Sequence, residues 1–81
     1  MQLLYTERFR QSYADAPLDV RKQCEKQLTL LAQDLRHPSL RAKKYDETRG
    51  IWQGRINRNW RFYFLIVRDS YTLLDMMPHP K

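Results

Sequence analysis

The sequence predicts an α+β fold in which two N-terminal helices pack on one face of a small antiparallel sheet. Two observations favour this fold. Apolar residues recur with a helical period up to Leu35 and with the alternating period of strands after Pro38. The predicted strands follow one another through short turns, which is typical of antiparallel pairing with helices on one face. The length of 81 residues predicts a single domain over residues 1–81.

The chain is expected to begin with a short strand over residues 2–5 and a short helix. Thr6 suits the N-cap of this helix, because its hydroxyl can accept a hydrogen bond from a free backbone N–H. Phe9 and Tyr13 are four positions apart and therefore share one face. The segment 15–17 should end the helix, and Pro17 fits the first position of a second helix.

The second helix has the clearest apolar stripe. Its members step by three or four positions: Val20, Cys24, Leu28, Leu31 and Leu35. The helix should end near Arg36, because His37 precedes Pro38 and is disfavoured in the helical region. The stripe makes Cys24 a core residue rather than a nucleophile. His37 is expected to cap or pack at the helix end.

Four strands are expected in the second half of the chain. The predicted order is strand 40–45, turn 46–50, strand 51–57, turn 58–59, strand 60–68, turn 69–70 and strand 71–77. Pro78 and Pro80 should stop the last strand. Together with the N-terminal segment, this gives a β-α-α-β-β-β-β order.

Alternation along the strands predicts one apolar and one polar face, because side chains two positions apart share a face. The expected core face holds Trp52, Ile56, Phe62, Phe64 and Ile66. The expected polar face holds Gln53, Arg55, Asn57, Arg61 and Tyr63. This grouping requires an odd-numbered loop or a bulge between strands 51–57 and 60–68, since a plain two-residue loop would separate the two arginines.

Positive charge is concentrated in the second half of the chain. Residues 1–34 carry five basic and five acidic groups, whereas residues 35–81 carry ten basic and four acidic groups and therefore the whole net charge of +6. Arginine outnumbers lysine ten to five, and the guanidinium fork suits phosphate. A polyanion, most commonly nucleic acid, is the favoured partner. The alternatives are a solubilising surface and a basic groove for an acidic protein.

Composition argues against several other classes of protein. One cysteine and two histidines supply neither a disulfide framework nor a plausible closed metal site. Two glycines cannot form a nucleotide-binding glycine loop. The longest apolar run is six residues, 62–67, and the N-terminus lacks the pattern of a signal peptide. We therefore expect a cytoplasmic protein with no membrane partner and no cofactor.

Several short motifs occur in a recognisable order and spacing. They are His-Pro-Ser-Leu at 37–40, Lys-Lys at 43–44, Gly-Ile-Trp at 50–52, Arg-Ile-Asn at 55–57, Trp-Arg-Phe-Tyr-Phe at 60–64, and a final His79. Over essentially its whole length the sequence resembles the RelE/ParE toxin superfamily of bacterial toxin–antitoxin systems. RelE-like members cut messenger RNA in the ribosomal A site, whereas ParE-like members poison DNA gyrase on the same fold.

The resemblance implies a toxin that is neutralised by a cognate antitoxin. It favours a ribosome-dependent mRNA endoribonuclease that uses the RNA 2′-OH as its nucleophile without a metal and so inhibits translation. The alternatives are a gyrase inhibitor and a degenerate toxin that only binds its antitoxin. Expected partners are the antitoxin, the ribosome and mRNA, and operator DNA for the toxin–antitoxin complex.

The resemblance also implies catalytic residues. Arg61 matches the family's arginine at the start of strand 60–68 and would stabilise the phosphate, and Arg55 matches a basic position on the preceding strand. His79 matches a histidine after the last strand and would transfer protons. Lys43 and Lys44 lie where the family often carries basic groups, but their opposite parity lets only one face the groove.

Further cations and rings are candidates for RNA binding, because cations hold phosphates and rings stack on bases. They are Lys44, Arg41, Tyr63, Trp60 and Arg58. For Trp60 packing is an equal alternative, for Arg58 a solvated hairpin tip is favoured, and Tyr45 is expected to pack in the core or at an edge. Many active members follow the histidine with an acid or a tyrosine, and Pro80 stands there in this chain. Tyr63 is therefore expected to substitute as the stacking ring.

Overall fold

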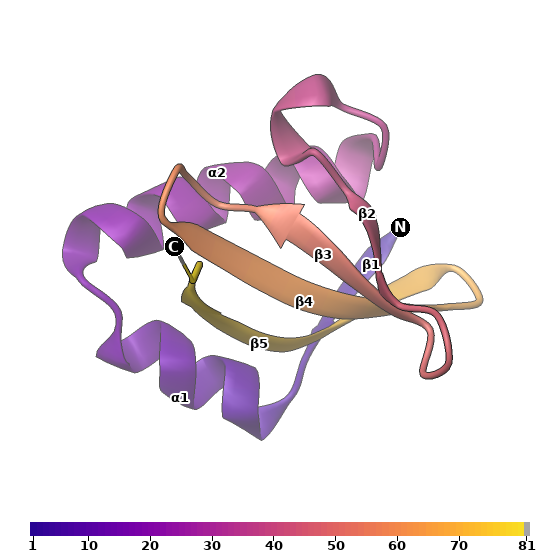
Figure 1. Cartoon of the computed structure of the whole chain (residues 1–81), viewed down its shortest axis with the longest axis horizontal. Coiled ribbons are helices and arrows are strands. Elements are labelled where there is room, and N and C mark those ends of the chain that lie inside the picture. The colour runs from indigo at the N-terminus through magenta and orange to yellow at the C-terminus, as the bar shows by residue number, and fades with distance from the viewer. Residues whose placement is uncertain (81) are drawn as a thin grey trace.

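The computed structural model describes residues 1–80, which form two helices against one sheet (Figure 1). The elements in chain order are β1 (Gln2–Tyr5), α1 (Glu7–Asp15), α2 (Leu18–Gln33), a 3-10 helix (Pro38–Leu40), β2 (Lys43–Asp46), β3 (Ile51–Arg55), β4 (Trp60–Val67) and β5 (Ser70–Pro78). The strand order in the sheet is β1-β5-β4-β3-β2. The predicted α+β fold and element order are confirmed. Neither helix within residues 1–80 is long and apolar enough to span a membrane.

The sheet is mixed, so the expectation of a wholly antiparallel sheet was wrong at one pair. β2, β3, β4 and β5 pair antiparallel in sequence, but β1 pairs parallel with β5. The two strands are joined by the helices and the rest of the sheet, and so long a connection allows parallel pairing where a short turn does not. The N-terminus therefore completes the sheet beside the last strand.

The first helix begins as predicted. The Thr6 hydroxyl accepts from the N–H of Phe9 at 3.1 Å and donates to the carbonyl oxygen of Leu73 at 2.8 Å. A single side chain thus caps α1 and joins it to β5. On the next turns of α1, Arg8 Nε donates to Asp75 at 2.8 Å, and the Ser12 hydroxyl donates to the same carboxylate. These bonds place α1 along β5.

The second helix is shorter than predicted and ends at Gln33 rather than near Arg36. Asp34 leaves the helix with extended dihedral angles, and its carboxylate accepts from the N–H of Arg36 at 2.9 Å. Aspartate favours such local bonds, which compete with helix continuation. His37 caps as expected, but it caps the start of the following 3-10 helix rather than the end of α2, since its Nδ1 accepts from the N–H of Ser39 at 3.2 Å.

The predicted strand 40–45 was wrong at its start. Leu40 is fully buried at the end of the 3-10 helix, and Arg41 follows in the left-handed region with φ 46°. The chain can therefore pair only from Lys43 onward. The other strand ends differ by one or two residues, since β3 stops at Arg55 and the last turn falls at residues 68–69.

Both helices and the inner face of the sheet share one core. Its fully buried side chains are Phe62, Phe64, Leu31, Leu40, Leu73 and Cys24. Burial, with a smaller contribution from Glu25, raises the pKa of the Cys24 thiol to about 12, which is consistent with a packing role. Ile66 was wrongly assigned to the core and is 37% exposed. It lies near the β4–β5 turn, which projects beyond both helices (Figure 1).

Candidate active site

The hairpin between β3 and β4 has the geometry that brings two arginines together. Arg55 and Arg61 are direct partners in the antiparallel register. The N–H groups of Ile56 and Asn57 both donate to the carbonyl oxygen of Trp60, at 3.1 and 3.4 Å. Two N–H donors on one carbonyl oxygen mark a bulge. A bulge or odd-numbered loop was predicted here, because only such an irregularity lets Arg55 and Arg61 share a face. Arg55 and Arg61 therefore share the outer face of the sheet, opposite Phe62 and Phe64.

Other candidates gather at the same end of this face. Lys43 pairs with Gln53, which pairs with Tyr63, so Lys43 belongs to the outer face. Arg61 pairs with Met77, and His79 continues that strand two positions later with its N–H donating to Asn59 at 2.6 Å. We call the following set the basic face: Arg41, Lys43, Arg55, Arg61 and His79. Arg41 precedes β2, and its charge acts on Arg61.

The environment of Arg61 favours an anion. Its pKa is lowered, first by partial burial and then by the like charges of Arg55 and Arg41. Both Arg55 and Arg61 are half-buried, so solvent screens their repulsion less than at a fully exposed site. A phosphate placed between the two guanidiniums would relieve this repulsion and accept charge-assisted hydrogen bonds.

Backbone carbonyl groups hold one side of the Arg61 guanidinium. Nη1 donates to the carbonyl oxygens of Asn57 at 2.6 Å and Trp60 at 2.9 Å, and more weakly to Arg58 at 3.4 Å. Within residues 1–80, Nε and Nη2 of Arg61 make no hydrogen bond to the protein. The side chain is thus oriented by the loop while part of its donor fork is left for a ligand.

Gln27 supports the site and was missed by the sequence interpretation. It is 6% exposed, and its Nε2 donates to the carbonyl oxygens of Arg55 at 2.8 Å and Ser39 at 3.1 Å. One amide thus joins α2 to the end of β3 and to the loop that carries Arg41. The sequence does indicate that Gln27 is buried, because it lies three positions after Cys24 and four before Leu31, on the apolar stripe of the helix.

Three candidates, Lys44, Trp60 and Arg58, do not join the basic face. Lys44 pairs with Trp52 on the opposite side of the sheet, and its Nζ lies 5.4 Å from the indole ring centroid. Trp60 is half-buried and packs against the core. Arg58 is exposed in the β3–β4 loop, beside the carbonyl groups that bind Arg61.

Tyr63 is 7% exposed and cannot present its ring to a base, whereas Tyr45 is 60% exposed. Of the two alternatives expected for Tyr45, packing at an edge is confirmed, because β2 is an edge strand of the sheet. The two rings meet edge to face with centroids 4.9 Å apart. Tyr45 shares the outer face with Lys43, and α1 borders this face along β5, where Arg8 and Ser12 bind Asp75.

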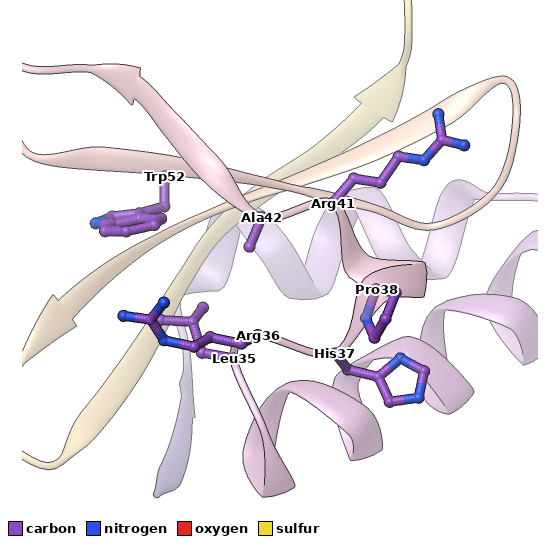
Figure 2. A pocket seen from close by; sticks show the side chains of 7 residues that line it. All are labelled: Leu35, Arg36, His37, Pro38, Arg41, Ala42 and Trp52. Atoms are coloured by element: carbon purple, nitrogen blue, oxygen red, sulfur yellow. The ribbon is translucent and has the colours of Figure 1, made fainter.

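A separate hollow lies between the end of α2 and the β2–β3 edge. Its volume is about 340 Å³, and Figure 2 shows its lining: Leu35, Arg36, His37, Pro38, Arg41, Ala42 and Trp52. Arg36 extends toward the same end as Trp52, whereas Arg41 and His37 extend away from it (Figure 2). Trp52 faces the helices, so this hollow lies on the opposite side of the sheet from Arg55 and Arg61, and Arg41 borders both.

Comparison with solved structures identifies the fold of this chain. The YoeB/ParE toxin from Agrobacterium tumefaciens superposes with a TM-score of 0.81 over 99% of this chain and 100% of that chain, at 13% sequence identity. The chain has the RelE/ParE toxin fold. No protein-family model matches the sequence, and no curated protein matches it.

Two further structures support the RelE/ParE fold. The RelB–RelE antitoxin–toxin complex from Methanococcus jannaschii matches with a TM-score of 0.77 and 16% identity, over 93% of this chain and 88% of that chain. The isolated E. coli RelE toxin matches with a TM-score of 0.75 and 13% identity, over 99% and 85%. The resemblance seen in the sequence is thus confirmed at the level of the RelE/ParE fold, which hosts more than one activity.

Proposed function

We propose that this chain is the toxin of a toxin–antitoxin system and that it cleaves messenger RNA on the ribosome. The observation that carries the proposal is the direct register pairing of Arg55 with Arg61 on the outer face of the sheet, with His79 at the same end. Two adjacent guanidiniums and an exposed imidazole suit phosphate-ester cleavage, which needs cations for the phosphorane and a group that transfers protons.

In the proposed reaction the RNA 2′-OH attacks the adjacent phosphorus. A P–O bond to the 2′-oxygen forms as the 2′-OH proton passes to water, and the P–O bond to the 5′-oxygen breaks, leaving a 2′,3′-cyclic phosphate and a free 5′-OH. The unused N–H groups of Arg61, together with Arg55, would stabilise the charge that develops on the nonbridging oxygens. His79 would give a proton to the departing 5′-oxygen. Lys43 would add a third cation beside them.

The proposed partner is a cognate antitoxin with an acidic segment. Structures with this fold include complexes named RelB–RelE and, from Staphylococcus aureus, YoeB–YefM. The net charge of +6 and the basic face are complementary to such a segment, and a disordered chain that folds on binding can cover a large surface. Binding over the basic face would block access of RNA to Arg55 and Arg61.

A gyrase inhibitor is the second candidate. It is favoured by the position after His79, where Pro80 stands in place of the acid or tyrosine that the resemblance leads one to expect. A protein that only binds gyrase would not need proton transfer from His79. A toxin that has lost activity and retains only antitoxin binding would share this feature.

Induction of the protein in a bacterial culture separates the candidates. Incorporation of labelled amino acid and of labelled thymidine is followed from the moment of induction, with an Arg61→Ala strain as the matched control. The proposed activity predicts that protein synthesis stops first and that Arg61→Ala abolishes the arrest. Replication arrest before translation arrest would contradict the proposal and favour the gyrase target, and no arrest would favour the inactive toxin.

A further inference from the structure

A hollow on the outer face of the sheet adjoins the basic face but contains none of its five residues. Its volume is about 290 Å³, and its walls include Tyr45, Tyr63, Ile51 and Met77. Met77 is also the register partner of Arg61, so the two sites share a border. We call this hollow the tyrosine pocket.

Tyr45 offers a flat apolar surface at this pocket. Its side chain is 60% exposed, although an aromatic ring gains free energy when it is removed from water. Tyr63 is buried beneath it and supports the ring through an edge-to-face contact with centroids 4.9 Å apart. A supported ring with an exposed surface is the arrangement that stacks on a nucleobase.

The rim of the pocket presents hydrogen-bond donors. Arg49 and Arg8 each bind a carboxylate through Nε, at 2.7 Å to Asp46 and 2.8 Å to Asp75. The two arginine side chains remain 74% and 79% exposed, whereas the two aspartate side chains are only 23% and 13% exposed. The rim therefore offers guanidinium N–H groups to a ligand, while the nearby acceptors are occupied.

The position of the pocket relative to the basic face suits a nucleotide. Tyr63 follows Arg61 by two residues on β4 and lies on the same face, which separates the two residues by about 7 Å along the strand. A base attached to the ribose next to a phosphate held by Arg61 can reach across such a distance. A purine fits best, since its larger ring covers more of Tyr45, and guanine presents two acceptors, N7 and O6, to a guanidinium fork.

We propose that the tyrosine pocket binds a purine base next to the phosphate held by Arg55 and Arg61, with Tyr45 stacking on the ring and Arg49 donating to its acceptors. The inference rests on the proposed function, because it assumes that RNA lies on the basic face. It replaces the buried Tyr63 by Tyr45 as the stacking residue and assigns a base preference to the site.

The test uses short single-stranded RNAs that carry 2-aminopurine, whose fluorescence falls when the base stacks on an aromatic ring. Binding to the full chain is measured by anisotropy, and stacking by fluorescence intensity. Wild type should quench the probe, Tyr45→Phe should retain the quenching, and Tyr45→Ala should lose it with about 5- to 150-fold weaker binding. Tyr5→Ala is the control, since Tyr5 is 39% exposed on β1 and lies outside this pocket.

Base preference is read from unlabelled competitors that differ only at the proposed position. Wild type should prefer purine to pyrimidine, and Arg49→Gln should reduce the preference for guanine while Tyr45 still quenches the probe. Binding by wild type without quenching, or unchanged binding and quenching in Tyr45→Ala, would overturn the inference and leave the proposed function intact. Loss of antitoxin binding in Tyr45→Ala with normal RNA binding would assign the pocket to the protein partner. Absence of RNA binding by wild type would also overturn the inference, whereas the proposed function would be contradicted only if ribosome-bound message stayed intact.

Discussion

Arg61 donates from Nη1 to the carbonyl oxygen of Asn57 at 2.6 Å and thereby closes the loop from which it projects. The same nitrogen reaches the carbonyl oxygen of Trp60 at 2.9 Å. The residue assigned to the phosphate is therefore also part of the β3–β4 hairpin, and its removal has a structural effect besides a catalytic one. Arg55, its register partner, makes no such side-chain bond within residues 1–80.

Arg61→Ala is expected to destabilise the fold, whereas Arg55→Ala is not. Removal of the guanidinium takes this donor from the carbonyl oxygen of Asn57, whereas that of Trp60 still accepts from two backbone N–H groups. Because the site is half-buried and water can replace part of the bond, we expect a loss of about 1 kcal/mol. Urea unfolding measures the difference. Equal stability of Arg61→Ala and wild type, or an equal loss in Arg55→Ala, would show that the loop does not depend on this side chain.

Gln27→Leu should lower the free energy of unfolding by about 1–3 kcal/mol, because it leaves the carbonyl oxygens of Arg55 and Ser39 without a donor in the interior. The control is Gln33→Leu at the exposed end of the same helix, which should change stability little. Because Gln27 positions Arg55, single-turnover cleavage should also fall in folded Gln27→Leu. Stability equal to that of the control would remove Gln27 from the supporting structure.

Gly54 is required by the ring opposite it. A Cβ at this position would overlap the ring of Phe62, its register partner, which is fully buried. Gly54→Ala should therefore cost about 1–3 kcal/mol by overpacking. The double variant with Phe62→Leu should show a favourable coupling energy, because the smaller side chain makes room for the methyl group. Strictly additive effects in thermal or urea unfolding would argue against the contact.

Acid should weaken the contact between α1 and β5 through Asp75. Partial burial alone would raise the pKa of this carboxyl, but hydrogen bonds from Ser12, Arg8 and the N–H of Met76 lower it overall. A carboxyl whose pKa is lower in the folded state stabilises the fold above its unfolded pKa, and this contribution is lost as the pH falls through the folded value.

Asp75→Asn should accordingly flatten the decline of stability between about pH 5 and pH 2. Asp46→Asn is the matched control, since hydrogen bonds from Arg49 also lower the pKa of Asp46, but the Asp46 side chain is more exposed than that of Asp75, at 23% against 13%, and solvent screens its pair more. Urea midpoints at several pH values give the slopes. The assignment to Asp75 would be wrong if both variants flattened the slope equally, or if neither did.

The sequence predicted the polar pairing of Arg55 with Arg61 correctly, because strand alternation and the need for a loop irregularity are local properties of the chain. The parallel pairing of β1 with β5 joins residues near opposite ends of the chain, such as Leu3 and Tyr71, and no local pattern contains that information. The end of α2 was misplaced for a local reason, since Asp34 competes for backbone N–H groups before Pro38 takes effect.

The sequence predicted which basic residues belong to the candidate site better than it predicted which aromatic rings are exposed there. Parity limited Lys43 and Lys44 to opposite faces, and only the register with β3 shows that Lys43 joins the arginines. For Trp60 and Tyr45 the sequence left two alternatives each, because composition does not reveal which face the helices cover. Trp60 packs against the core, whereas Tyr45 packs on the outer face of the edge strand. A tertiary arrangement, not a propensity, decides which ring is available to RNA.

Cleavage of ribosome-bound messenger RNA in a single turnover tests the central claim most directly. Wild type should cut the message and leave a 2′,3′-cyclic phosphate and a 5′-OH, and Arg61→Ala should cut about 100- to 1000-fold more slowly, because a positioned donor to the phosphorane is lost. Arg61→Lys should recover part of the rate, since a point charge cannot form the bidentate contact. Variants are compared in conditions where urea unfolding shows each to be folded. The assigned mechanism would be contradicted if Arg61→Ala cut at the rate of wild type. The proposed function itself would be contradicted if wild type left the message intact and blocked supercoiling by gyrase instead.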